Sequence, residues 1–294
     1  MAIAERLGRP HVVEDIGLIF PPKDMPHHPS LDVFQEFPWL AYIPKDRFPK
    51  SVAFIPDGNG RWAAENGVDR VQGHMKGAKA LQNTVNFLVE IPYIEQFIVW
   101  GASADNWEKR DRNELNGIMS IVGTMLRENE GFFHEHEIRV VHLGGRERIE
   151  HEYPELWESI QYTERVTKDY SKKTFGLGLD FGGRDHDQEV RLMQKTVQLA
   201  RQQPVIPQDD KYFLDLYYET REGGKLFKDP DLVIRTSGEQ RPSGFGWPAY
   251  YGESYVIQKY LPDLTRHDSA VALWQYAQRD RRLGGRPQQG NTTR

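Results

Sequence analysis

Short apolar runs rich in β-branched and aromatic residues recur along the chain, and each ends at a glycine, a proline or a polar residue. Runs of this length and composition are typical of buried strands. We predict six strands, at residues 51–55, 97–100, 138–143, 175–181, 232–234 and 254–257.

Between these runs, apolar residues recur every three or four positions, which is the period of one face of a helix. In residues 75–90 this stripe consists of Ala78, Leu81, Val85 and Leu88. Similar patterns predict further helices, one opened by Arg61 and others at residues 115–126, 156–166, 190–200, 212–218 and 270–282. Strands that alternate with helices imply right-handed crossovers. We therefore predict an α/β fold, a single domain with a largely parallel central sheet of about six strands flanked by helices.

The ends of the chain show neither period. Residues 1–50 are rich in proline and read as an N-terminal extension that is ordered in part, with Trp39, Leu40 and Tyr42 available to dock it on the domain. We expect one folded domain over residues 51–285 and a flexible tail over residues 286–294.

Composition narrows the class of protein. The chain has 294 residues, a net charge of −5 and no cysteine. The negative charge argues against a nucleic-acid partner, and the lack of cysteine excludes disulfides, a thiolate zinc site and a cysteine nucleophile. No apolar run approaches the roughly 20 residues of a membrane span. We expect a cytoplasmic protein with no membrane span.

The first predicted strand stops at Pro56 and is followed by Asp57-Gly-Asn-Gly-Arg61. Two glycines one residue apart let backbone N–H groups converge at the start of a helix, where the helix dipole favours an anion. Asp57 beside such a site is unfavourable unless a cation bridges it to the anion, and Mg²⁺ binds phosphates in this way. The turn therefore predicts a Mg²⁺–diphosphate site, although Asp-Gly and Asn-Gly also occur in ordinary turns.

A second candidate anion site follows the predicted strand at residues 232–234. Its segment, residues 235–243, offers two arginine side chains, hydroxyl groups and an intervening carboxylate, from Arg235, Ser237, Glu239, Arg241 and Ser243. The planar guanidinium group of arginine suits phosphate oxygens. The same segment alone is also compatible with a solvated turn held by internal salt bridges.

Four motifs then occur in one order: Asp57-Gly-Asn-Gly-Arg-Trp62, Arg70-Val-Gln-Gly-His74, Ser103-Ala-Asp-Asn-Trp107 and the Arg235–Arg241 segment with Glu253. In order and spacing the chain resembles the cis-prenyltransferases typified by undecaprenyl diphosphate synthase, from about Ser51 to Gly285. The resemblance implies a parallel-sheet enzyme that joins an allylic prenyl diphosphate to a second C5 isoprenoid diphosphate and releases pyrophosphate.

Roles for individual residues follow from the same resemblance. Asp57 is tied to Mg²⁺ and to ionisation of the allylic substrate, and Glu253 helps to bind the metal. Ser103 and Asn106 act beside the reacting carbons, and Trp62 and Trp107 wall the apolar channel. The allylic diphosphate is held by Gly58, Asn59, Gly60, Arg61, Arg70 and His74, and the second diphosphate by the Arg235, Ser237, Glu239, Arg241 and Ser243 segment. Arg282 to Gly285 reach a neighbouring subunit, so a homodimer is expected.

Several positions depart from the family pattern near the reacting carbons and in the second phosphate loop. They are Ala102, Ala104, Asp105, Lys109, Pro242 and Gly244, with one residue missing before Trp247. These departures favour a short product and an irregular, lavandulyl-type coupling in which dimethylallyl diphosphate is the acceptor. A regular cis-polyprenyl diphosphate synthase, and a non-catalytic partner subunit of a prenyltransferase complex, stay open as alternatives.

Overall fold

The computed structural model describes residues 32–182, 188–202, 205, 209–221 and 223–279. Its centre is a six-stranded sheet in the order β3-β4-β2-β1-β5-β6, and every neighbouring pair is parallel. The strands are β1 (Ser51–Ile55), β2 (Gln96–Ala102), β3 (Ile138–Leu143), β4 (Lys173–Leu179), β5 (Leu232–Arg235) and β6 (Glu253–Val256). All six predicted strands are thus confirmed, and the predicted α/β fold with them.

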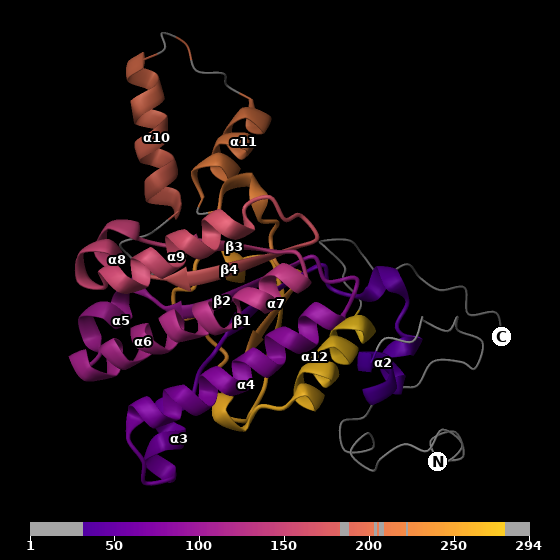
Figure 1. The fold of residues 1–294 in the computed structure, drawn as a ribbon. Helices are drawn as coiled ribbons and strands as arrows, with labels where there is room; N and C mark the ends of the chain where they lie inside the picture. Colours follow the sequence, from indigo (N-terminus) through magenta and orange to yellow (C-terminus); the bar gives the residue numbers. More distant parts are fainter. Residues whose placement is uncertain (1–31, 183–187, 203–204, 206–208, 222, 280–294) are drawn as a thin grey trace, which may run out of the picture.

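Helices connect the strands (Figure 1). They are α2 (Asp32–Glu36), α3 (Asn59–Glu65), α4 (Arg70–Glu90), α5 (Ala104–Lys109), α6 (Arg112–Glu128), α7 (Glu130–Glu135), α8 (Arg146–Glu152), α9 (Pro154–Thr167), α10 (Gln188–Gln202), α11 (Asp210–Thr220) and α12 (Arg266–Gln278). Each predicted helix is present. The last ends at Gln278, before the predicted end, and residues 280–282 of that prediction lie outside the described residues.

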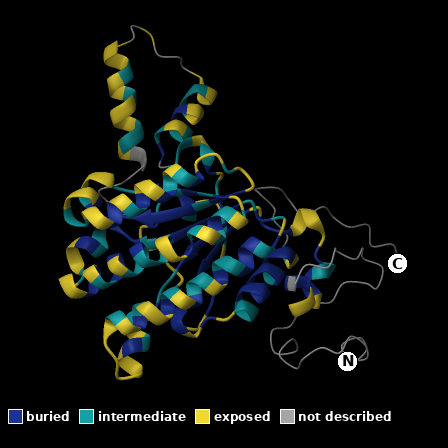
Figure 2. Ribbon diagram, in the orientation of Figure 1, coloured by how far each residue is buried: buried dark blue, intermediate teal, exposed yellow. Residues whose placement is uncertain are grey.

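Alternate side chains of each strand enter different layers, as the two-residue period of a strand requires. In β1, Val52 and Phe54 join the large core under α4, α6, α9 and α12, whereas Ala53 and Ile55 join a smaller core. The smaller core is completed by Phe227, Phe245 and Trp247 from outside the sheet, in addition to side chains of the strands. Buried residues accordingly run along the strands and the inner sides of the helices (Figure 2).

Residues before β1 also belong to the large core. Trp39 and Leu40 are buried, Tyr42 packs against the same cluster, and Phe37 lies edge-on to Phe87 of α4 with ring centroids 5.7 Å apart. Arg266 at the start of α12 bonds both Glu36 and Glu90. The part of the N-terminal region that the structure describes is therefore packed on the domain.

The sheet order places two chain segments side by side at its centre. β1 lies between β2 and β5, and Ile55 is paired in register with Arg235. The chain thus crosses from one side of β1 to the other between β4 and β5, and such a switch point is where parallel α/β sheets bind ligands, at the carboxyl ends of the strands. The Asp57 turn and the Arg235 loop both begin there.

None of the described helices is long and apolar enough to cross a membrane.

Candidate active site

The turn after β1 is built around Gly58. Gly58 has φ +101° and precedes the first residue of α3. A Cβ at this position would lie 2.8 Å from the Tyr260 ring and 3.1 Å from its Cα, so both the backbone angle and the space require glycine. The turn is fixed to the second loop by Thr236, whose hydroxyl accepts from the Asp57 N–H at 2.8 Å and donates to the Asp57 carbonyl at 2.7 Å.

Asp57 is held by two arginines. Arg235 donates to its Oδ2 at 2.8 Å, Arg61 donates to its Oδ1 at 3.2 Å, and the Gly58 N–H donates to Oδ1 at 2.7 Å. Partial burial tends to raise the pKa of Asp57, but the hydrogen bond and charge of Arg235, helped by Arg61 and Gly58, outweigh it and lower that pKa. Asp57 is therefore ionised at neutral pH.

Close packing of α3 on α4 places Asn59 and His74 together. A Cβ at Gly73 would lie 2.4 Å from the Asn59 carbonyl oxygen, and one at Gly77 would lie 2.0 Å from its Oδ1. The two glycines of α4 thus make room for Asn59, whose Nδ2 lies 3.1 Å from His74 Nδ1. His74 then accepts at Nδ1 and carries its proton on Nε2.

Glu114 of α6 is the partner on the other side of His74. Its Oε1 lies 3.0 Å from His74 Nε2, its Oε2 accepts from Arg70 at 2.9 Å, and Arg110 lies 3.6 Å from Oε1. Burial tends to raise the pKa of Glu114, but Arg70, His74 and Arg110 lower it overall. The sequence prediction missed Glu114 and Arg110; a carboxylate four residues after an arginine was the available signal.

These groups line one polar pocket. Its walls are Pro56, Asp57, Gly58, Asn59, Gly60, Arg61, Ala64, Arg70, His74, Arg110 and Glu114. Three arginine side chains and the amino end of α3 meet there, which suits a diphosphate. The structure therefore brings Asp57 together with all six residues that were predicted to hold the allylic diphosphate.

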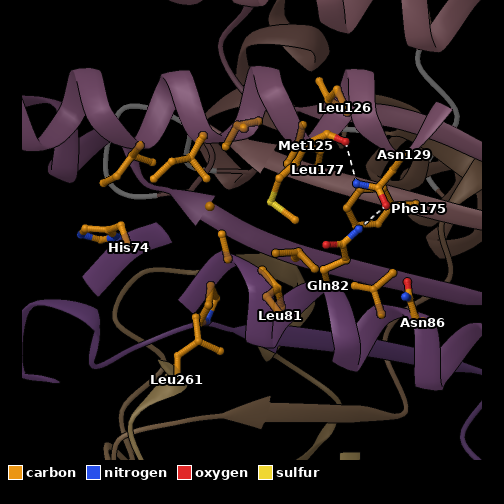
Figure 3. Close-up of a pocket in the computed structure, with 18 of the residues that line it drawn as sticks. His74, Leu81, Gln82, Asn86, Met125, Leu126, Asn129, Phe175, Leu177 and Leu261 are labelled. Atoms are coloured by element: carbon orange, nitrogen blue, oxygen red, sulfur yellow. Dashed lines mark hydrogen bonds between the residues drawn. The ribbon is translucent and has the colours of Figure 1, made fainter. Parts of the chain in front are cut away.

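An apolar cavity adjoins this pocket and shares Pro56, Asn59 and His74 with it. It runs between α4 and α6 over the sheet, with His74 at one end and Phe175 at the other (Figure 3). Most of its lining is aliphatic or aromatic. A molecule with a diphosphate head and a hydrocarbon tail fits the two spaces together.

The second loop lies beside the Asp57 turn. Arg235 is buried and donates to Ser243 Oγ at 2.8 Å and to the Arg241 carbonyl oxygen, in addition to Asp57. The Glu239 carboxylate lies 3.0 Å from the guanidinium group of Arg61 and 3.5 Å from that of Arg241, so it links the two side chains. The Ser237 hydroxyl is buried against Gly58 and has no hydrogen-bond partner in the described structure. Arg241 is largely exposed, so its guanidinium group is accessible.

Ser103 and Asn106 hold the start of α5. Ser103 Oγ accepts from the Asn106 N–H, and Asn106 Oδ1 accepts from the Ser103 N–H, each at 3.1 Å. This reciprocal pair is a capping box. Neither side chain lines the polar pocket or the apolar cavity, so their assignment to the reacting carbons remains a prediction.

Neither Trp62 nor Trp107 is among the residues that line the apolar cavity, and their assignment to the substrate channel stays a prediction. Trp62 donates to Asp263 at 2.9 Å and has the Lys76 ammonium 4.1 Å from its ring centroid. Trp107 is buried beside α8, where its N–H donates to Glu152 at 3.2 Å. Each indole N–H thus bonds a carboxylate that is not part of the cavity lining.

The two predicted metal ligands, Asp57 and Glu253, lie apart within a single chain. Glu253 opens β6 and pairs in register with Leu232, at the amino ends of the strands, whereas Asp57 follows their carboxyl ends. Glu253 instead bonds Arg279 at 3.0 Å. Among the described residues no group of three or more acidic or histidine side chains could hold a metal. Asp57 still suits Mg²⁺, which binds through one or two carboxylates plus substrate phosphates.

Comparison with known sequences identifies the family. A family described as putative undecaprenyl diphosphate synthase matches residues 55–284. The chain belongs to the cis-prenyltransferases. An isoprenyl transferase of Thermotoga maritima is 31% identical over 254 residues, covering 81% of this chain and 98% of that protein. An isoprenyl transferase of Aquifex pyrophilus is 33% identical over 239 residues, covering 81% and 96%. This cis-prenyltransferase is accordingly an enzyme of the isoprenyl transferase class and a prenyl diphosphate synthase.

Solved structures agree with the assignment. Lavandulyl diphosphate synthase from Lavandula x intermedia, solved with dimethylallyl diphosphate, has a TM-score of 0.70 and 26% identity over 80% of this chain and 98% of that one. A probable undecaprenyl diphosphate synthase from Campylobacter jejuni has a TM-score of 0.61 at 21% identity, with the same coverage, and shares the fold. Arg282 to Gly285, which the sequence assigned to a subunit contact, lie outside the described residues.

The His74 network predicts sensitivity of the fold to acid. Burial lowers the pKa of His74, although the bond to Glu114 opposes this. The unfolded chain then binds a proton more readily than the folded one, so stability falls as the pH drops below about 6.5. We expect the free energy of unfolding of the wild type to fall between pH 7 and 5. His74 contributes up to about 1.4 kcal/mol per pH unit to this slope, so the slope of H74Q should be smaller by that amount. Urea titrations at each pH measure it; equal slopes for both proteins would contradict the assignment.

Proposed function

We propose that this enzyme couples an allylic prenyl diphosphate, with a chain of five to fifteen carbons, to a second C5 isoprenoid diphosphate and releases pyrophosphate. The observation that supports the proposal is the continuity of the two spaces: the apolar cavity opens at His74 and Asn59 onto the pocket that Asp57, Arg61, Arg70 and Arg110 surround. A diphosphate head and a prenyl tail are bound in one orientation, with the carbon next to the diphosphate at the junction.

The residues of the first pocket act on the leaving group. Negative charge accumulates on the pyrophosphate as the allylic carbon–oxygen bond breaks, so fixed positive charges and N–H groups stabilise the transition state most. These charges and N–H groups come from Arg61, Arg70 and the backbone after Gly58. The arginines need not move, because Asp57 and Glu114 already hold them in place. Mg²⁺ bound by Asp57 and the diphosphate oxygens would add Lewis-acid stabilisation.

The second loop binds the acceptor in this proposal. Arg241 is accessible, and Arg235 and Ser243 lie next to Asp57, so a second diphosphate held there shares the same edge of the sheet with the first. The departures at Pro242 and Gly244 fall in this loop, and those at Ala102 and Ala104 lie at the end of β2 and the start of α5. Together they support a short, irregular, lavandulyl-type coupling with dimethylallyl diphosphate as acceptor. The fold similarity to a lavandulyl diphosphate synthase supports the same choice.

We further propose that the enzyme is a homodimer. Helices α10 and α11 project from the body of the domain (Figure 1). On α10, Val190, Met193 and Val197 share one helical face and are 43%, 59% and 52% exposed. An exposed apolar face of this kind marks an interaction surface. We infer that it is covered by a second copy of the chain.

Product analysis tests the reaction. Purified protein with Mg²⁺ and labelled C5, C10 and C15 diphosphates is expected to release pyrophosphate and to form short products. Dephosphorylated products would be sized and their branching assigned by mass spectrometry and NMR. A ladder of long polyprenols would support the regular polyprenyl synthase instead. Absence of pyrophosphate release with every substrate pair would leave the non-catalytic partner subunit.

Replacement of Asp57 tests its role in ionisation. D57N keeps the shape of the side chain and removes its charge, so we expect kcat to fall by about 10² to 10³ while the KM for the allylic substrate changes less. Steady-state pyrophosphate release measures both constants. The matched control is D169N, which makes the same change at an exposed position after α9 and should keep full activity. An unchanged kcat in D57N would show that the charge of Asp57 has no role in the reaction.

Sedimentation velocity tests the dimer. We expect wild type to sediment as a dimer at micromolar concentration, and M193E/V197E, which places two carboxylates on the apolar face of α10, to shift it to a monomer. Q194E, on the same helix, is the control for added charge alone. A monomeric wild type at all concentrations would contradict the proposal.

A further inference from the structure

Amide side chains line part of the far end of the apolar cavity. Figure 3 shows Gln82 of α4 and Asn129, the residue after α6, at the opposite end from His74. Gln82 Nε2 donates to Asn129 Oδ1 at 2.5 Å, and Asn129 Nδ2 donates to the Met125 carbonyl oxygen at 2.7 Å. One turn further along α4, Asn86 also lines the cavity, and its Oδ1 is buried with no hydrogen-bond partner in the described structure.

These amides interrupt an otherwise apolar wall. Leu81, Val85, Ile118 and Val122 line the cavity from α4 and α6 before and around the pair. Aromatic side chains line the same end of the cavity, with Phe133 stacked on Phe175 at a centroid distance of 6.4 Å. The Gln82–Asn129 bond therefore bridges the two helices at the point where a hydrocarbon chain growing from His74 would have to pass between them.

We propose that the Gln82–Asn129 pair sets the longest prenyl chain that the cavity accepts, at two to three C5 units; this rests on the proposed function. Gln82 follows His74 by eight residues, which is about 12 Å along a helix. An extended C5 unit adds four bonds of about 1.5 Å each. Because the bonds zigzag, the chain becomes longer by only about 5 Å. A chain of 10 to 15 carbons therefore ends at the pair.

A longer chain has to displace the pair. Breaking the bond between the two amides leaves both facing hydrocarbon, where neither water nor the chain replaces the lost hydrogen bond. The amide pair thus acts against chain extension both by its bulk and by its polarity.

The two amides differ in what else they do, and this difference makes the inference testable. Asn129 also caps the end of α6 through the Met125 carbonyl, so its replacement changes the fold locally. Gln82 makes no such backbone contact among the described residues and is half-buried, so Q82A removes the bridge and leaves the cap. Asn83, next to it on α4, is exposed and provides the matched control N83A.

The experiment compares wild type, Q82A and N83A in two assays. The first measures binding of unreactive thiolo analogues of dimethylallyl, geranyl, farnesyl and geranylgeranyl diphosphate by calorimetry. The second sizes the products formed from natural substrates. We expect the affinity of wild type and N83A to rise with chain length up to C10 or C15 and to fall at C20. Q82A should bind the C20 analogue about tenfold more tightly and lengthen the product by at least one C5 unit.

Each result has a distinct meaning. If wild type binds these analogues but Q82A gives the same length series and the same products, the amide pair does not set chain length and the proposed function stands. If wild type favours C20 over C15, the inference fails in the same way. If wild type binds no prenyl analogue of any length and releases no pyrophosphate, both the inference and the proposed function are overturned.

Discussion

The ion pair between Asp57 and Arg235 is the interaction on which the site depends. It exists because β1 and β5 are parallel neighbours in register, so the two segments that leave their carboxyl ends meet. Arg235 is nearly buried, and a buried charge without a partner is strongly destabilising. Asp57 supplies that partner, while Thr236 fixes the same two loops through their backbones. The pair joins the two segments that we propose as diphosphate sites, and it does so in the free protein.

A second carboxylate does the same for the rest of the pocket. Glu114 bonds Arg70 and His74, as Asp57 bonds Arg61 and Arg235. Asp57 lies between the cations Arg61 and Arg235 and offsets their mutual repulsion, and Glu114 does the same for Arg70 and Arg110. The pocket can therefore keep several donors aimed at one space in the free protein, and an entering diphosphate meets groups that are already positioned.

Sequence reasoning succeeded where the determining residues are close together in the chain. The strands follow from local composition, and the Asp57 turn follows from two glycines within three residues. It failed where distant segments decide. Glu114 reaches His74 only because α6 packs on α4, a contact between segments 40 residues apart that no local pattern shows. The helices α5, α7 and α8, of six or seven residues, are too short to show a clear period and were not predicted.

Helix α4 connects the polar and the apolar halves of the site. Arg70 and His74 in its first turns face the diphosphate pocket, and Leu81, Val85 and Asn86 face the cavity further along the same helix. The rise of a helix is fixed by its hydrogen bonds, so in the proposed binding mode residue spacing on one rigid element sets the distance from the head of the substrate to the end of its tail. Gly73 and Gly77 let α4 pack closely against Asn59, and this packing fixes the position of the helix relative to the Asp57 turn. Chain length and head-group position are therefore properties of the same packed helix, and a change in one part of α4 need not disturb the other.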